Sequence, residues 1–316
     1  MDFSRDFIGK FRKDARIHPS SSSPGLPGKI LNKNGSKMLL TSNFYDITLS
    51  LPSRSGFAET YESCLELIYG VRQKKARKFA QCGINNLRDA LKHEDYRVEA
   101  KRALELLNMG FGHVRDILKE RFSPSHRMFF LLLSFFKKED LLFVDIETRS
   151  LNFETAIIII GAGYFEENKY RVDQFTALNE AGEYEIIQEF KKLLPGRKAF
   201  VTFNGKSFDI PYIDSRLAYY GDTYQSLTED YHNFDLLHFS RCAFKDMYGS
   251  YKLKEMETKL LGKSRKDDID GSEVDYYYSR YLQTGKADFI NPIVYHNNID
   301  IMSLAELTGR INEKWK

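Results

Sequence analysis

The sequence predicts an α/β protein in which a mixed sheet flanked by helices follows a mostly helical N-terminal region. Residues 141–177 contain three β-rich segments separated by turn signals, a pattern that fits an antiparallel meander. Helical and strand-like segments alternate beyond them, and this alternation places helices against the sheet. The apolar content of 42% is enough to form a substantial core.

Composition and length favour a protein of the reducing cytoplasm with no membrane segment. The 316 residues allow two ordinary domains. The longest apolar runs, residues 128–136 and 156–165, are much shorter than the ~20 residues of a membrane-spanning helix. The first 18 residues carry charges where a signal peptide needs an apolar core, and the three cysteines are scattered without a CxxC pair.

The net charge of +3 conceals an uneven distribution. Residues 1–139 contain 25 Lys and Arg against 15 Asp and Glu, a net charge of +10. Residues 140–316 contain 22 against 29, a net charge of −7. A basic part joined to an acidic part indicates that one part holds a polyanion and the other gathers cations. Chance clustering on solvated faces is the alternative.

The N-terminal elements begin with a Ser/Pro/Gly stretch, "SSSSPGLPG", which predicts a flexible tail over residues 1–28. A basic, mostly helical region is expected over residues 29–139. It starts with strand-like alternation over residues 35–52, which fits a small hairpin or a sheet edge. The period then becomes helical over residues 58–107.

One part of the basic region, residues 67–93, reads as three helices separated by two glycine turns and resembles the helix-hairpin-helix motif. In that motif a glycine hairpin and a helix N-terminus present backbone N–H groups to a DNA phosphate. Arg72, Lys74 and Lys75 surround the first turn and are candidate phosphate ligands. Arg72 replaces the second glycine of the motif, which limits how closely the backbone can approach a phosphate. A plain packing hairpin is the alternative.

Asp145 and Glu147 stand two residues apart in "LLFVDIET", which otherwise reads as a buried strand. Residues i and i+2 of a strand project from one face, so the two carboxylates should repel each other. A divalent cation between them removes this repulsion, and hard oxygen ligands suit Mg²⁺ or Mn²⁺. An edge strand with two solvated acids is the alternative, but the apolar neighbours argue against it.

Two further acids follow in similarly apolar surroundings. An amphipathic helix over residues 183–194 and a strand over residues 198–205 precede Asp209, which stands at the start of a helix after an Asn-Gly turn. Asp300 lies on the amphipathic helix of residues 291–307. An acid on an apolar face needs a cation or a hydrogen-bond partner. For Asp209, a helix N-cap is the structural alternative.

The stretches "FVDIET", "TFNGKSFDIP" and "YHNNID" resemble the three exonuclease motifs of the DnaQ-like, ribonuclease-H-fold 3′–5′ exonucleases, the DEDD superfamily. "TFNGKSFDIP", "NFDLLHFSR" and "YHNNIDIMSL" are similar to the YprB-type ribonuclease-H-like proteins of bacteria. The likeness covers residues 140–316, and three motifs in the right order make it specific. It implies a ribonuclease-H-like exonuclease domain that hydrolyses nucleic acid, with DNA favoured over RNA.

The resemblance also implies a role for each acid. Asp145 would bridge two metal ions, Glu147 and Asp300 would complete one site, and Asp209 would serve the second site through water. Two cations ~3.5–4 Å apart can stabilise both the attacking and the leaving oxygen of a phosphodiester displacement.

The general base of this superfamily is a His five residues before the last Asp or a Tyr four residues before it. Here Tyr295 and His296 stand five and four residues before Asp300, so the residue types are exchanged. Residues i and i+4 share a helix face, so His296 is expected beside Asp300 and is the favoured base. A histidine that caps the helix start is the alternative.

Three residues near Asp209 are candidate substrate contacts. Asn204 and Phe208 resemble positions that line the cleft of the superfamily, and Lys206 could contact a phosphate. A turn asparagine and a solvated turn lysine are the structural alternatives.

The first motif departs from its usual form, since Arg149 and Ser150 replace small residues expected near the 3′ end of the substrate. Two other functions use the same residues: an endonuclease acting on RNA–DNA hybrids, and a catalytically silent nucleic-acid-binding module. Retention of all four acids argues against the silent module, because a binding protein does not need such costly groups. The sequence does not identify a protein partner.

Overall fold

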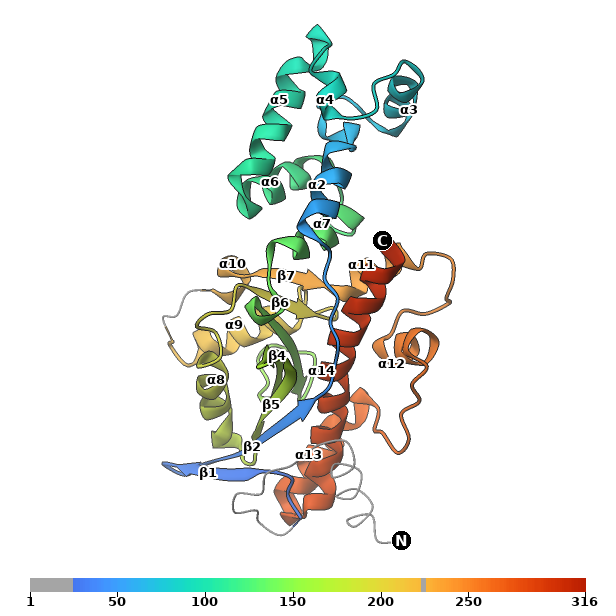
Figure 1. Cartoon of the computed structure of the whole chain (residues 1–316). Helices are drawn as coiled ribbons and strands as arrows, with labels where there is room; N and C mark the ends of the chain where they lie inside the picture. Colours follow the sequence, from blue (N-terminus) through green and yellow to red (C-terminus); the bar gives the residue numbers. More distant parts are fainter. Residues whose placement is uncertain (1–24, 223–225) are drawn as a thin grey trace. The chain divides into compact units, whose positions relative to one another are not determined.

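A computed structural model describes residues 25–222 and 226–316 of the chain (Figure 1). Residues 1–24 of the tail predicted over residues 1–28 lie outside the described residues. The chain divides into two compact units. The described part of the first unit comprises residues 25–49, 138–222, 226–237 and Tyr248–Arg310, and the second unit comprises Ser50–Lys137, His238–Met247 and Ile311–Lys316.

The first unit is built on a seven-stranded sheet with the order β1-β2-β5-β4-β3-β6-β7. The strands are β1 (Lys29–Lys33), β2 (Ser36–Tyr45), β3 (Leu141–Thr148), β4 (Ile157–Glu166), β5 (Lys169–Ala177), β6 (Ala199–Thr202) and β7 (His232–Asp235). β3, β4 and β5 form an antiparallel meander, whereas β6 pairs in parallel with both β3 and β7. The predicted mixed sheet is confirmed.

The β1–β2 hairpin extends the sheet beyond the meander. β2 pairs with β5 from Met38↔Ala177 to Tyr45↔Tyr170, and β1 pairs with β2. The alternation seen in the sequence therefore does form a hairpin at the sheet edge. It does not belong with the basic helical region expected to start at residue 29, because this long-range pairing places it in the first unit.

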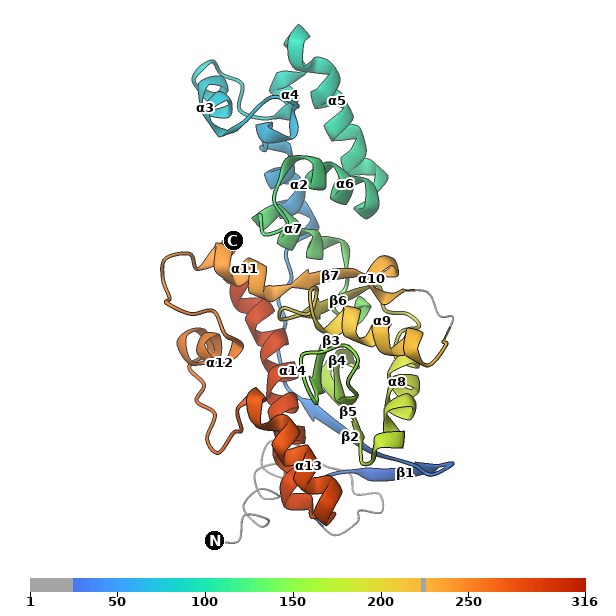
Figure 2. The ribbon, with the colours of Figure 1, turned by 180° about the vertical axis from the view of Figure 1, so that it is seen from behind.

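Helices cover both faces of this sheet. The helical segments of the first unit are η3 (Lys138–Asp140), η4 (Glu180–Gly182), α8 (Glu183–Lys191), α9 (Asp209–Tyr219), α10 (Leu227–Asp230), α12 (Leu253–Met256), the π-helical η5 (Glu257–Leu261), η6 (Gly271–Glu273) and α13 (Val274–Thr284); α11 (Leu236–Ala243) and α14 (Ala287–Trp315) continue into the second unit. Both views show α8 and α9 on one side of the strands and α14 on the other (Figures 1 and 2).

Two apolar clusters correspond to these two faces. Leu142 and Val144 of β3 pack with Ile187 of α8 and Ile213 of α9 in the first cluster. The second cluster joins β4 to α13 and α14. Since side chains alternate along a strand, Asp145 and Glu147 lie on the face opposite Leu142 and Val144, which is the face that α14 covers.

The second unit is helical, as predicted. Its segments are α2 (Arg54–Glu62), η1 (Leu65–Leu67), α3 (Gln73–Gln81), α4 (Leu87–Ala90), α5 (Glu94–Met109), α6 (Phe111–Arg121), α7 (Arg127–Leu131) and η2 (Leu132–Phe135). Phe57, Leu67, Leu118 and Phe130 are among its fully buried side chains. Among the described helices of both units, none is long and apolar enough to cross a membrane.

Candidate metal centre

Asp145 and Glu147 lie near the C-terminal end of β3, which is an inner strand with β4, β5, β2 and β1 on one side and β6 and β7 on the other. Asp145 is opposite Gly161 and Glu147 is opposite Ile159 on β4. Glu147 is buried and Asp145 is half-buried. A paired strand inside the sheet therefore carries both carboxylates, which are not on a solvated edge.

Helix α14 brings His296 and Asp300 to the same place. The two residues are four apart and share a helix face. The Nε2 atom of His296 lies 3.6 Å from Asp300 Oδ2 and 3.7 Å from Glu147 Oε1. Glu147, His296 and Asp300 offer ligand atoms that all lie within 4.8 Å of one another.

The carboxylate of Asp145 is oriented by Asn297. The Nδ2 atom of Asn297 donates to Asp145 Oδ2 at 2.8 Å and approaches the Asp145 carbonyl oxygen at 3.2 Å. Asn297 Oδ1 in turn accepts from Gln174 Nε2 at 2.9 Å. A Cβ atom on Gly161 would lie 2.2 Å from Asn297 Oδ1, so only glycine allows the amide to reach Asp145. Sequence reasoning missed Asn297 and Gln174, although Asn297 stands inside the third motif.

Asp209 approaches the acid pair of β3 from helix α9. Its Oδ1 atom accepts the backbone N–H of Ile146 at 3.0 Å, between the two acids of the strand. The preceding turn is held by Asp235, which accepts the backbone N–H of Asn204 at 2.8 Å and that of Lys206 at 3.2 Å. Asp209 is the first residue of α9 and Phe208 is its N-cap, so the carboxylate bonds to β3 rather than acting as the predicted alternative cap.

The four acids interact electrostatically although they come from three elements. Burial raises the pKa of each carboxyl, that of Asp209 to about 7 and those of Asp145 and Glu147 well above the ordinary range. After burial, the charges of Asp300, Glu147 and Asp209 raise the pKa of Asp145 further. The cluster therefore holds more negative charge than its surroundings compensate, and a divalent cation would relieve it.

These residues fit a hard divalent cation. Asp145, Glu147, Asp209 and Asp300 supply carboxylate oxygens, the donors that Mg²⁺ and Mn²⁺ prefer. The raised pKa values express the same fit, because a group that ionises only at a cost gains most from a bound cation.

One side of the cluster contains a guanidinium that the sequence did not indicate. Arg265 contacts Asp300 through Nη2, Glu257 at 2.5 Å and Asp268 at 3.1 Å, and its side chain is only 3% exposed. Asp268 also contacts His296, with 2.9 Å between Asp268 Oδ1 and the Nδ1 atom of the ring. Arg265 and Asp268 lie in the charged stretch "KSRKDDID", which reads as a solvated loop.

His296, rather than Tyr295, lies among the acids. Burial lowers the pKa of His296, but the hydrogen bond to Asp268 and the charge of Asp300 outweigh burial, so the pKa is raised overall. Tyr295 is half-buried and packs against the apolar cluster that includes Ile290 and Val294.

Three of the side chains predicted to contact substrate flank Asp209 in the chain and are not among the clustered ligand atoms. Asn204 is exposed and adopts a left-handed conformation, with φ of 66°. Lys206 is exposed. Phe208 is half-buried and packs edge-on against Phe153 and Tyr212, at ring-centroid distances of 6.0 and 5.3 Å. Arg149 is tied to α13, where its Nε atom donates to Asp275 at 2.8 Å.

The basic hairpin lies in the second unit and differs from the prediction in one respect. Gly70 has the positive φ of a turn, 74°, but the segment before it is a single 3-10 turn, Leu65–Leu67, rather than a helix. The backbone hydrogen bonds of this segment join residues three apart, from Leu67 N to Cys64 O and from Ile68 N to Leu65 O, which is the 3-10 pattern. Arg72 and Lys74 are exposed, and Lys75 Nζ lies 5.0 Å from the ring centroid of Tyr96. The helix-hairpin-helix assignment stays a prediction.

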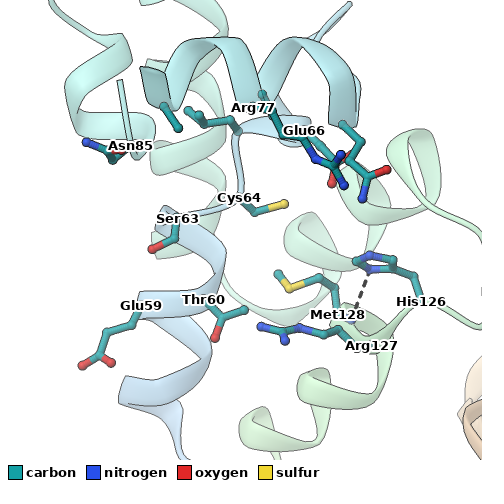
Figure 3. Close-up of a pocket in the computed structure, with 14 residues that line it drawn as sticks. Glu59, Thr60, Ser63, Cys64, Glu66, Arg77, Asn85, His126, Arg127 and Met128 are labelled. Carbon is teal, nitrogen blue, oxygen red and sulfur yellow. Dashed lines mark hydrogen bonds between the residues drawn. The ribbon is translucent and has the colours of Figure 1, made fainter. Parts of the chain in front are cut away.

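The second unit also contains a pocket of about 630 Å³ beside α2 and α3 (Figure 3). Burial raises the pKa of the Cys64 thiol in this pocket to about 11. His126 Nδ1 accepts the backbone N–H of Met128 at 3.3 Å. Neither side chain is therefore an activated nucleophile or a free base.

Known proteins resemble the part of the chain that carries the acids. A family model described as the RNase_H superfamily matches residues 142–312, more than half of the chain. The uncharacterized protein YprB of Bacillus subtilis (strain 168) is 28% identical over 181 residues, covering 57% of this chain and 43% of YprB. The chain thus spans less than half the length of that relative. The family B DNA polymerase from the hyperthermophilic archaeon Pyrobaculum calidifontis shares a TM-score of 0.39 and 14% identity, covering 52% of this chain and 23% of the polymerase.

We predict that the metal-free protein loses stability as the pH rises. The pKa of Asp209 is raised to about 7, so the folded protein holds a proton that the unfolded chain releases near its ordinary pKa of about 4. This contribution is complete below about pH 4 and is lost as the pH rises through about 7. In EDTA, calorimetry should show the melting temperature falling by several degrees between about pH 5 and about pH 8.

Two additions make this test specific. Mn²⁺ should raise the melting temperature more at the higher pH, where the carboxylates are ionised. The substitution Asp209→Asn should flatten the fall in EDTA, because it removes one titrating group. A melting temperature that rises with pH in EDTA would contradict the prediction.

Proposed function

We propose, from the premise that the chain belongs to the RNase_H superfamily, that it is a metal-dependent 3′–5′ exonuclease that hydrolyses nucleic acid, with DNA favoured over RNA. Membership of the superfamily supports nuclease activity. The observation that carries the finer proposal is the buried cluster in which acids from β3, α9 and α14 interact around the imidazole of His296.

Each residue of the cluster has a task in this reaction. Two bound divalent cations, held by Asp145, Glu147, Asp209 and Asp300, would stabilise the attacking and leaving oxygens of the phosphodiester displacement. His296 would accept the proton of the attacking water at Nε2. Asn297 holds the Asp145 carboxylate in one orientation, and the Ile146 N–H does the same for Asp209.

The exonuclease reading is preferred over the hybrid-cutting endonuclease for two reasons. The Asn-Gly-x-x-Phe-Asp stretch before α9 resembles the exonuclease branch, and α14 carries a His before the last Asp as that branch does, although here it stands four rather than five residues before it. A silent binding module is disfavoured, because four clustered carboxylates with raised pKa values cost stability and give a binding protein no advantage.

The second unit is the proposed holder of the nucleic acid. None of the side chains of α3 is buried, and Lys74, Arg77 and Lys78 of this helix are exposed. Exposed cations of this kind neutralise phosphates and release counterions, which strengthens binding at low salt. They carry no sequence information, so the binding would be general for nucleic acids.

We predict that Asp145→Asn abolishes nuclease activity while leaving nucleic-acid binding intact. Loss of one carboxylate from the metal site should reduce the rate by at least ~100-fold, comparable to removal of one charge-stabilising group from an active site. Single-stranded, duplex and RNA oligonucleotides labelled at the 5′ end, incubated with Mn²⁺ or EDTA, would report the products. Asp230→Asn, at an exposed acid of α10, is the matched control.

The same assay separates the candidate functions. A substrate blocked at its 3′ end should resist an exonuclease. Internal cleavage of a blocked RNA–DNA hybrid would instead support the endonuclease. Equal nucleic-acid degradation by the wild type and by Asp145→Asn would refute the proposed centre.

We also predict that Arg72→Gln combined with Lys74→Gln weakens binding and flattens its salt dependence. If each side chain neutralises one phosphate, the slope of log affinity against log salt should fall by about 2 in magnitude. Fluorescence anisotropy over a range of salt concentrations measures this slope. Lys101→Gln combined with Lys119→Gln, on α5 and α6 of the same unit, removes equal charge and should change the slope less. Equal slopes for both double variants would exclude the hairpin as the binding element.

A further inference from the structure

The imidazole of His296 contacts, through its Nδ1 atom, a buried ion-pair network that lies outside all three motifs. Glu257 is the first residue of η5, and Arg265 and Asp268 lie in the segment that connects η5 to η6. The side chains of Glu257, Arg265 and Asp268 are 1%, 3% and 0% exposed. Buried charges are expensive unless they are paired, and here each contacts a partner of opposite charge.

The geometry assigns the two oxygens of Asp268 to different partners. Arg265 Nη1 donates to Oδ2 at 3.1 Å, and the Nδ1 atom of His296 lies 2.9 Å from Oδ1. Arg265 Nη1 also lies 3.4 Å from His296 Nδ1, a longer contact than the one between Nδ1 and Oδ1. A carboxylate paired with a guanidinium is ionised and can only accept, so the Nδ1 atom must carry a proton. In the neutral ring the other nitrogen, Nε2, is then unprotonated. Nε2 is the atom that faces Glu147 and Asp300.

The position of Arg265 is also restricted. Its Nε and Nη2 atoms both donate to the Glu257 carboxylate, each at 2.5 Å, and form a bidentate ion pair. Its Nη1 atom is thereby aimed at Asp268. A guanidinium only donates hydrogen bonds, so the atom of residue 268 that faces Arg265 Nη1 must be a hydrogen-bond acceptor.

We propose that Asp268 is a positioning residue that fixes the tautomer and orientation of His296, with Arg265 setting the orientation of Asp268. This inference rests on the proposed function of His296 as the base. In the reaction, Nε2 accepts one proton from water, the resulting hydroxide oxygen bonds to phosphorus, and the bond from phosphorus to the leaving 3′ oxygen breaks. Solvent then donates a proton to the leaving oxygen and accepts the proton held at Nε2, which restores the neutral ring.

The substitution Asp268→Asn tests the proposal because it preserves shape but changes the hydrogen-bonding pattern. Arg265 will select the amide oxygen of the new side chain, so the amide NH₂ group will face His296 Nδ1. The ring must then accept at Nδ1 and carry its proton at Nε2, where it can no longer act as a base. We expect kcat to fall by roughly 10²–10⁴-fold, the range of general-base catalysis, with KM for the oligonucleotide unchanged.

The tautomer itself is measured by ¹H–¹⁵N long-range correlation spectra of the histidine rings at alkaline pH, without substrate or metal. The signals of His296 are assigned with His296→Ala. We expect the Nδ1–H form in the wild type and the Nε2–H form in Asp268→Asn. An Nε2–H form in the wild type, or the same tautomer and kcat in both proteins, would overturn the proposal.

Controls separate positioning from folding and from metal binding. Asp267→Asn changes the adjacent, exposed acid and should leave kcat and the His296 spectrum unchanged. Mn²⁺ affinity measured by calorimetry should be the same in Asp268→Asn as in the wild type; a loss as large as that of Asp145→Asn would make Asp268 a ligand and overturn the proposal. If Asp268→Asn does not fold, Asp268→Glu keeps an acceptor and should retain the Nδ1–H form, and its failure to do so counts against the proposal.

The spectra also distinguish the two levels of inference. An inactive wild-type protein would refute the nuclease function. The contact between Asp268 and His296 is tested separately, because the tautomer of the His296 ring is measured in the absence of substrate.

Discussion

The mutual repulsion of four carboxylates in one largely buried cluster is the constraint on which the arrangement of the first unit depends. The acids come from three separate stretches of the sequence, and each would ionise more easily in water. The fold therefore has to hold them together against their charges. A paired inner strand, a helix fixed at its first turn and a 29-residue helix supply the rigidity. Loops alone would let the acids separate and recover their hydration.

The ways in which the acids are held differ across the cluster. Asp145 and Asp209 accept hydrogen bonds from neutral donors, the Asn297 amide and the Ile146 backbone N–H, which orient a carboxylate without cancelling its charge. Asp300 instead contacts the guanidinium of Arg265, which compensates charge directly. The charge of Asp145 is consequently less compensated than that of Asp300, and a cation bound beside Asp145 would relieve it.

Sequence reasoning reached the features that follow from local periodicity. The i, i+2 acids of β3 and the i, i+4 relation of His296 to Asp300 follow from strand and helix geometry, and the meander follows from turn signals. Arg265 and Asp268 were beyond its reach, because a charged stretch reads as solvated until tertiary packing encloses it. The pairing of β2 with β5 was equally hidden, since it joins residues more than a hundred positions apart. The sequence predicts the glycine turn at Gly70 correctly, but the segment before it is a 3-10 turn and not the expected helix.

A metal ligand and a general base make different demands on a fold. A carboxylate needs only to present an oxygen, which a single orienting donor can ensure. An imidazole must present one particular nitrogen without its proton, so it needs an acceptor on the opposite side, and that acceptor must be held in turn. The two oxygens of Asp300 show how closely these demands are linked, because Arg265 contacts Oδ1 while Oδ2 faces His296 Nε2. Arg265, which orients Asp268 and through it His296, therefore also determines which oxygen of Asp300 is left for a cation.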